Sequence, residues 1–592
     1  MCGFAGELAL DRAVDIAAVE RMAATMARRG PDGRGSWSSG AVALAHRRLK
    51  VIDLSERGAQ PLVDSQLGLT IVFNGCIYNH RELRAELERD GYVFFSSSDT
   101  EVIAKAYHRW GTSCVERFAG MFAFVLAERD SGRLVLARDR LGIKPLYLAE
   151  VDGALRFAST LPALLAGGGV DTALDPVALH HYFSWHAVVP APLTVLCGVR
   201  KLAPATVAVV EPDGTRSERT YWNPPYERRE QHQDIGEGEW AEIVLDALRT
   251  AVKRRMVSDV PVGVLLSGGL DSSLIVALLA ESGQRNLATF SIGFDAGAGE
   301  DGDEFNYSDL IAREFGTEHQ SWRVGPARVL AALDGALDAM SEPMTSHDAV
   351  AFYLLSEEVS ASCTVVQSGQ GADEVFAGYS WYPPLASAEG LGDDVYSAEF
   401  FDRDERELSE LLAPDFRTAE ASPSRRFVAA HFARPHAETP LDRALRLDTQ
   451  IMLVDDPVKR VDNMAMAWGL ELRTPFLDHE LIELAAACPP SLKLAHGGKG
   501  VLKTAARNHV PDAVIDRSKG YFPVPAISHL EGEALALVRD ALTSAVARDR
   551  GLYRPEHVAT LLEDPIGSRT PIGSSKLWQV GLLELWLQRH GL

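Results

Sequence analysis

The chain has 592 residues, 46% of them hydrophobic, and its 82 acidic and 59 basic residues give a formal net charge of -23. This length is sufficient for more than one domain core, and the negative charge repels a nucleic-acid backbone. The apolar runs are far shorter than the roughly 20 residues of a membrane-spanning helix, and the N-terminus lacks the features of a signal peptide. We therefore expect a cytoplasmic, globular protein with no nucleic-acid and no membrane partner.

Short runs of apolar residues separated by turns dominate residues 1–215, for example LTIVFNGCIYN from Leu69 and GMFAFVLAERD from Gly120. Such runs predict antiparallel β structure. Residues 80–90 and 100–110 have helical spacing, so helices should flank the sheets. This first domain is expected to end at residue 215.

Residues 216–239 are predicted to be a linker, because the stretch from Pro224 is polar and poor in aliphatic residues. Over residues 240–592, the short β-branched runs VPVGVLL, LATFSIGF and CTVVQSG alternate with helical patterns. That alternation is typical of a parallel α/β sheet. Beyond about residue 430 the pattern is chiefly helical, so we expect helices to cover the sheet.

Cys2 becomes the N-terminal residue when the initiator methionine is removed. Its thiol then lies beside a free α-amine, whose pKa of about 7.7 to 8.0 allows it to act as the base for the nucleophile. The other cysteines form no metal-binding or disulfide pattern, and we interpret them as small apolar core residues. A cysteine at the second position proves nothing alone, so its interpretation depends on the other segments of this domain.

Those segments contain the groups that an amide-bearing amino acid requires. Arg48 can pair with a carboxylate and Asp99 with an ammonium group. Asn74 and the backbone amide of Gly75 can form an oxyanion hole, and glycine allows the backbone to approach a substrate closely.

Taken together in this order, the segments resemble the class II glutaminase domain, an α+β N-terminal-nucleophile fold with an αββα sandwich. The resemblance implies that Cys2 is the nucleophile, that Arg48 and Asp99 bind glutamine, and that Asn74 and Gly75 stabilise the tetrahedral oxyanion. Asparagine synthetases normally carry glutamate at the glutamine-binding position where this chain has Cys76. Without that carboxylate, we expect Asp99 to take a larger share in binding the substrate ammonium.

The segment from Val262 to Ser273 reads as an apolar strand, a small-residue loop and the start of a helix. Backbone amides in such a loop bind oligoanions. The phosphate loop of phosphoryl-transfer enzymes is absent. The segment instead matches the S-G-G-x-D-S pyrophosphate loop of adenylating enzymes at Ser267, Gly268, Gly269, Asp271 and Ser272.

A second segment, QSGQGADEVF from Gln367, should reach the same edge of the sheet, where ligands of open α/β sheets bind. Asp271 and Asp373 are candidate Mg²⁺ ligands, since one or two carboxylates usually hold Mg²⁺ together with phosphate oxygens and water. Lys519 is a candidate for neutralising charge on the phosphates.

From residue 240 onward these segments, with the run from Arg460 to Ala485, resemble the synthetase domain of glutamine-hydrolysing asparagine synthetases, an α/β pyrophosphate-loop ATP-binding domain with a helical C-terminal part. The resemblance implies that Leu265 and Ile292 line the adenine site, that Ser368 and Gly369 contact ATP, and that Lys519 assists adenylation and amide formation. In the implied reaction a carboxylate attacks the α-phosphate of Mg-ATP to give an acyl-adenylate. Ammonia from the first site then passes through an internal channel and displaces AMP.

Gln370 and Glu374 are expected on the side of the cavity that binds the acceptor. Because of Gln370, the identity of the acceptor carboxylate stays undecided. Asparagine synthetases usually carry an acidic residue at the position of Gln370, and a glutamine cannot act as a base. With Gln370 and Cys76 at these positions, the sequence more closely resembles the N-acetylglutaminylglutamine amidotransferases, which amidate the carboxylate of a dipeptide. Aspartate, a small peptide and a secondary metabolite all remain as acceptors.

Two hypotheses of other classes also remain, a glutaminase whose second domain is only regulatory and a non-catalytic scaffold. The intact pyrophosphate loop and Cys2 argue against both. A homodimer is left open.

Overall fold

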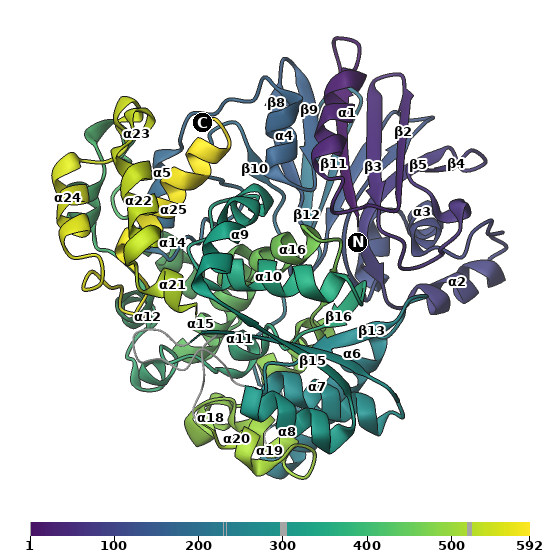
Figure 1. Cartoon of the computed structure of the whole chain (residues 1–592). Coiled ribbons are helices and arrows are strands. Elements are labelled where there is room, and N and C mark those ends of the chain that lie inside the picture. The colour runs from purple at the N-terminus through teal and green to yellow at the C-terminus, as the bar shows by residue number, and fades with distance from the viewer. Residues whose placement is uncertain (1, 229, 233, 296–304, 518–523) are drawn as a thin grey trace.

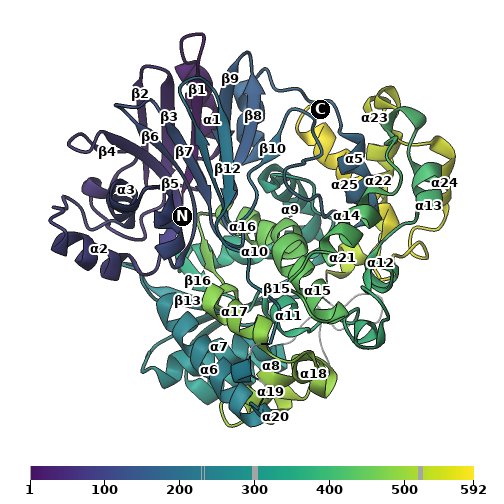
Figure 2. The same cartoon turned by 180° about the vertical axis from the view of Figure 1, so that it is seen from behind.

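The computed structural model describes residues 2–228, 230–232, 234–295, 305–517 and 524–592. A β-rich first domain lies above an α/β second domain (Figure 1). Strand β1 starts where the two domains meet, as the views from the front and from behind both show (Figures 1 and 2). The fold therefore brings the N-terminal segment, with Cys2, close to the second domain.

Two antiparallel sheets form the centre of the first domain. In spatial order the first contains β10 (Arg200–Lys201), β8 (Tyr147–Val151), β9 (Ala154–Ala158), β1 (Gly3–Ala9), β3 (Val42–Arg48) and β2 (Gly33–Ser39). The second contains β12 (Arg216–Thr220), β11 (Thr206–Val210), β7 (Leu134–Arg138), β6 (Gly120–Glu128), β5 (Leu69–Ile77) and β4 (Leu62–Asp64). Because β12 pairs with β11 along its whole length, the second sheet extends five residues past the expected boundary at residue 215.

Alternating apolar residues of the two sheets pack against each other, among them Phe4, Val72 and Val125. Helices α1 (Ile16–Thr25) and α4 (Leu161–Gly167) cover the first sheet, and α2 (His80–Arg89) and α3 (Asp99–Trp110) cover the second. The helices at 80–90 and 100–110 are thus confirmed, as is the αββα sandwich.

A five-stranded parallel sheet forms the centre of the second domain. Its strands in spatial order are β15 (Glu318–Val324), β14 (Ala288–Phe294), β13 (Val262–Leu265), β16 (Val365–Gln367) and β17 (Glu471–Arg473). One face packs against α6 (Glu237–Arg254), α7 (Leu270–Glu281) and α8 (Phe305–Phe315), and the other against α9 (Pro326–Ala339), α10 (Asp348–Ser360) and α16 (Lys459–Met466). The expected α/β domain is confirmed, although β15 and β17 were not predicted.

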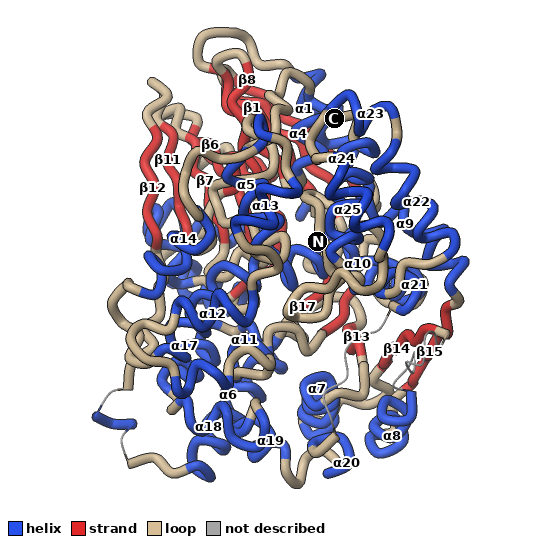
Figure 3. The backbone as a smooth tube through the Cα atoms, turned by 90° about the vertical axis from the view of Figure 1, so that its left-hand side faces the viewer, coloured by secondary structure: helices blue, strands red, loops and turns tan. Residues whose placement is uncertain are grey.

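The remaining helices pack outside these six; α5 comes from the first domain and contacts α13 and α14, while α21 to α25 gather beside α9 (Figures 1 and 3). They are α5 (Pro176–Ser184), α11 (Ala372–Phe376), α12 (Asp393–Phe400), α13 (Glu405–Leu411), α14 (Pro423–Phe432), α15 (Pro440–Leu447), α17 (His479–Ala487), α18 (Pro490–Leu494), α19 (Gly500–Ala506), α20 (Asp512–Ile515), α21 (Pro525–Ser528), α22 (Gly532–Thr543), α23 (Ala545–Arg550), α24 (Pro555–Glu563) and α25 (Lys576–Arg589). Two π-helical turns join α15 to α16, the second containing Pro457. Proline has no backbone N–H to donate, which favours such a local change of pitch.

Buried charges join the two domains. Asp462 on α16 pairs with Arg29 at 2.9 Å and with Lys144 at 2.8 Å, both from the first domain. Lys201 pairs in the same way with Asp455 at 2.6 Å. Within the described part of the chain, every helix is too short or too polar to cross a bilayer.

Candidate active sites

The first pocket lies at the face of the sandwich that meets the second domain. Cys2 immediately precedes β1 and is 7% exposed. Its backbone N–H donates to Oδ1 of Asn74 at 3.1 Å, and its Sγ lies 4.0 Å from the carbonyl oxygen of Leu49. The pocket is lined by the predicted residues Cys2, Arg48, Gly75, Cys76 and Asp99. Five of the six predicted glutaminase residues therefore share one cavity, and the sixth, Asn74, is hydrogen-bonded to Cys2.

The predicted oxyanion pair lies on β5, directly beside the cysteine. Asn74 is fully buried. Gly75 has φ +153°, and a Cβ at this position would lie 2.1 Å from the carbonyl oxygen of Met121 on the neighbouring strand. Only glycine fits this position, because any side chain would move β5 away from β6.

Arg48 and Asp99 carry opposite charges into the pocket. The Arg48 guanidinium donates to the carbonyl oxygens of Ser55, at 2.8 Å, and Asp53. These carbonyls orient the guanidinium but leave its formal charge available to a substrate carboxylate. Asp99 is the first residue of α3 and accepts a hydrogen bond from the Ile77 N–H at 3.0 Å, while burial raises the pKa of its carboxyl.

Burial also raises the pKa of the Cys2 thiol. The thiol is therefore largely protonated near neutral pH, and attack on an amide requires a base. Cys76 lies in the same pocket with its Sγ 3.7 Å from Nη2 of Arg473, and burial raises the pKa of that thiol far above its usual value. Cys76 is thus neutral and supplies no negative charge to the pocket.

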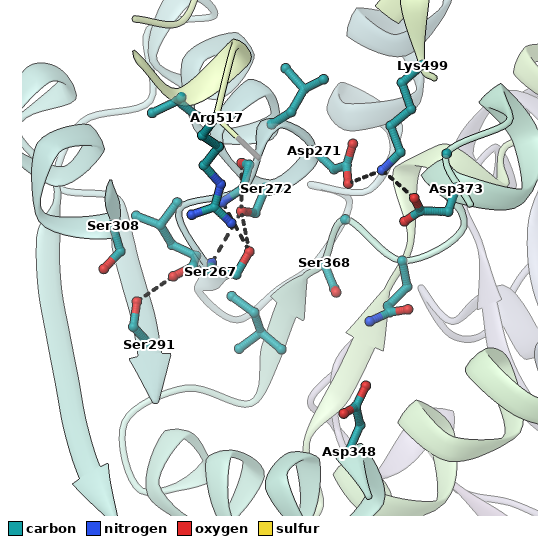
Figure 4. A pocket seen from close by; sticks show the side chains of 18 of the residues that line it. Ser267, Asp271, Ser272, Ser291, Ser308, Asp348, Ser368, Asp373, Lys499 and Arg517 are labelled. Atoms are coloured by element: carbon teal, nitrogen blue, oxygen red, sulfur yellow. Dashed lines mark hydrogen bonds and ion pairs between the residues drawn. The ribbon is translucent and has the colours of Figure 1, made fainter. Parts of the chain in front are cut away.

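The second pocket is a cavity of about 520 Å³ at the carboxyl ends of β13, β14 and β16 (Figure 4). Strand β13 ends at Leu265, and α7 begins at Leu270 after the small-residue loop. The cavity is lined by the predicted residues Leu265, Ser267, Gly269, Asp271, Ser272, Ile292, Ser368, Gly369, Gln370 and Asp373. The two motif segments therefore meet at one edge of the sheet, as expected.

Two predicted residues lie just outside this lining. Gly268 shapes the loop, since its φ is +74° and a Cβ there would lie 2.6 Å from the backbone nitrogen of Ser308. Glu374 is buried behind the cavity and accepts a hydrogen bond at 2.8 Å from the hydroxyl of Tyr379, which does line it. Burial raises the pKa of Glu374 to about 7. Lys519 lies outside the described residues.

The two carboxylates predicted to hold Mg²⁺ converge on one cation. Nζ of Lys499 lies 2.7 Å from Asp271 and 3.0 Å from Asp373 (Figure 4). Two carboxylates around one positively charged position, next to a phosphate-binding loop, fit the oxygen ligands that Mg²⁺ takes. In the described part of the chain, no group of three or more His, Cys, Asp or Glu side chains could hold a metal ion, so this site offers two carboxylates only.

Sequence reasoning missed three charged residues of the cavity lining, Lys499, Arg460 and Asp348. Arg460 is buried at its wall, pairs with Asp456 at 2.9 Å and lies 3.9 Å from Asp348. Asp348 lies at the other end of the cavity from Lys499 (Figure 4). Arg460 belongs to the run that carried the resemblance, so its position there was the available signal.

Comparison with known proteins agrees with this geometry. A family model described as "Asparagine synthase" matches residues 244–588, and one described as "Glutamine amidotransferase domain" matches residues 1–222. The chain belongs to the asparagine synthetase family. The predicted family, two-domain fold and enzyme class, a carbon–nitrogen ligase that hydrolyses glutamine, are thereby confirmed.

Curated relatives of this asparagine synthetase family member span nearly the whole chain. "Asparagine synthetase [glutamine-hydrolyzing] 1" of Bacillus subtilis is 30% identical, over 99% of this chain and 96% of the relative. A putative asparagine synthetase of Mycobacterium tuberculosis is 31% identical over 99% and 97%. "Amidase chry2" of Gibberella zeae is 28% identical over 96% and 94%. A solved glutamine phosphoribosylpyrophosphate amidotransferase from B. subtilis matches 54% of this chain and 90% of its own, with 15% identity and a TM-score of 0.31.

Proposed function

We propose that this protein makes asparagine from aspartate, with glutamine as the nitrogen donor and ATP as the energy source. One observation carries the proposal. A cysteine pocket with groups for an amide-bearing amino acid and a separate cavity with a pyrophosphate loop lie in one chain. We place the reaction in the cytoplasm, where glutamine, aspartate and ATP are available together.

In the first step, Cys2 attacks the side-chain amide of glutamine. Once Met1 is removed, the α-amine of Cys2 takes the thiol proton and passes it to the leaving nitrogen, so that ammonia departs and a thioester remains. Asn74 and the Gly75 amide bind the oxyanion that forms during attack. Water then cleaves the thioester to give glutamate and the free thiol.

In the second step, the acceptor carboxylate attacks the α-phosphate of ATP, and pyrophosphate leaves. The loop from Ser267 to Ser272 binds the phosphates, and Asp271 and Asp373 would hold Mg²⁺, which would neutralise phosphate charge. Lys499 and Lys519 supply further positive charge. Ammonia then attacks the acyl-adenylate carbonyl and AMP leaves; exclusion of water during this step would protect the adenylate from hydrolysis.

Aspartate as the acceptor is supported by the far end of the ATP cavity. Arg460 offers a cation for the α-carboxylate, and Asp348 beside it offers an anion for the α-ammonium. A free amino acid carries both groups, whereas an N-acetylated dipeptide lacks the ammonium. The relatives named asparagine synthetase support the same acceptor.

The test measures AMP and asparagine formed with aspartate, ATP and either glutamine or ammonia. We expect wild-type protein to use both nitrogen sources, and Cys2→Ala to lose only the glutamine-dependent reaction. Failure of Cys2→Ala with ammonia would refute the assignment of two separate sites. Turnover with an N-acetylated dipeptide but not with aspartate would replace the proposed acceptor.

A further inference from the structure

One wall of the glutaminase pocket comes from the synthetase domain. Glu471 opens β17, the edge strand of the parallel sheet, and its side chain lines the pocket together with Cys2, Arg48 and Asp99. It is 1% exposed. The glutaminase motifs do not include this residue, which belongs to another domain.

The carboxylate of Glu471 is held in place and kept charged. Arg473, two residues along the same strand, places Nη2 2.6 Å and Nε 2.7 Å from its Oε1. Arg473 is itself fixed by donating to the carbonyl oxygens of Arg255 and Val257, each at 2.7 Å. Although burial favours the neutral acid, Arg473 lowers the pKa of Glu471 to about 2.

The negative charge of Glu471 affects the ionisation of the Cys2 thiol and the Asp99 carboxyl. It is one of the causes that raise the pKa values of the Cys2 thiol and the Asp99 carboxyl, in both cases after burial. The three side chains line the same small pocket, where little solvent separates them to screen their charges. Glu471 therefore contributes to the electrostatic potential in this pocket, even though β17 is a strand of the parallel sheet in the second domain.

The charges in the pocket match an α-amino acid. Arg48 offers a cation for a carboxylate, while Asp99 and Glu471 are two carboxylates in the same small cavity. Two buried carboxylates that face one cavity are stabilised by a cation between them. Of the groups that glutamine brings, only the α-ammonium is a cation.

We propose that Glu471, supplied by the synthetase domain, binds the α-ammonium of glutamine together with Asp99 and so sets the preference of the glutaminase site for an α-amino acid. Cys76 is neutral and supplies no such charge. Glu471 is a substrate-binding residue and takes no part in bond making. The inference rests on the proposed glutaminase reaction at Cys2.

The test compares Glu471→Gln with Glu584→Gln as a matched control, because Glu584 is also a buried carboxylate paired with an arginine, Arg550, but lines neither pocket. Glutamate and ammonia release are measured with glutamine and with glutaramate, which keeps the carboxylate and the amide but lacks the α-ammonium. A charged hydrogen bond in a buried site is worth about tenfold to a hundredfold in affinity. We expect Glu471→Gln to raise the KM for glutamine by at least about tenfold, to change kcat little, and to reduce the preference for glutamine over glutaramate by the same factor.

The control variant should keep the wild-type KM and preference, and Glu471→Asp, which keeps the charge, should lie between wild type and Glu471→Gln. If Glu471→Gln does not fold, the comparison of Glu471→Asp with wild type still tests the inference. An equal loss for both amides, a loss confined to kcat, or an unchanged KM would overturn the inference. Glutaminase activity in Cys2→Ala would instead overturn the proposed function, so the two failures can be told apart.

Discussion

The tight packing at Gly75 allows the oxyanion assignment to be tested by one methyl group. In Gly75→Ala the new Cβ would lie 2.1 Å from the Met121 carbonyl oxygen, whereas an ordinary contact begins at 3.4 Å. The backbone would have to move by about 1.3 Å to relieve this clash. A displacement of that size removes the Gly75 N–H from the developing oxyanion. We therefore expect a loss of about 10² to 10³ in kcat, or about 3 to 4 kcal/mol of transition-state stabilisation.

The assay measures glutamate release from glutamine, with ammonia-dependent asparagine formation in the same preparation as the control for folding. The first rate should fall by this factor and the second should stay near wild type, since residue 75 lines only the cysteine pocket. A Gly75→Ala enzyme with wild-type glutaminase kcat would refute the oxyanion assignment.

Two further predictions concern the domain interface and the metal site. Asp462→Asn should destabilise the protein by about 3 to 5 kcal/mol at pH 7, since it leaves two buried cations without their anion; urea unfolding followed by tryptophan fluorescence measures this, and equal midpoints would contradict it. Burial raises the pKa of Asp462, but Arg29 and Lys144 lower it further, so that it lies below its usual value. The extra stability of wild type over Asp462→Asn should therefore be complete above about pH 4 and should disappear as the pH falls through the folded-state pKa. Lys499→Met should bind Mn²⁺, an EPR-visible substitute for Mg²⁺, roughly tenfold more tightly without ATP, because the ammonium no longer competes for Asp271 and Asp373. Unchanged Mn²⁺ affinity would refute that reasoning.

The parts of the two sites that could be predicted from the sequence are those formed by neighbouring residues. The loop from Ser267 to Ser272 is one such case, because a strand, a turn and a helix start follow each other directly. Cys2 could be assigned as the nucleophile because other segments of its own domain carry the remaining glutaminase residues. The loop required only short-range order along the chain, whereas Cys2 required the resemblance of its whole domain to a known family.

The residues that were missed depend on packing between distant segments. Cys76 and Arg473 are 397 positions apart, and nothing local in either segment indicates that they meet. Strand β17 has only three residues, two of them charged and buried, so it lacks the apolar run by which a buried strand is predicted. Lys499 likewise meets Asp271 and Asp373 only after α19 packs against α6 and α7.

Strand β17 also connects the two sites mechanically. Its Glu471 faces the cysteine pocket, while the carbonyl oxygen of Arg473 accepts a hydrogen bond at 2.9 Å from the N–H of Ser368 in the ATP cavity. Without its synthetase domain, the glutaminase domain would therefore lose one wall of its own pocket. A displacement of this short strand would therefore disturb the glutamine pocket and the ATP cavity at once.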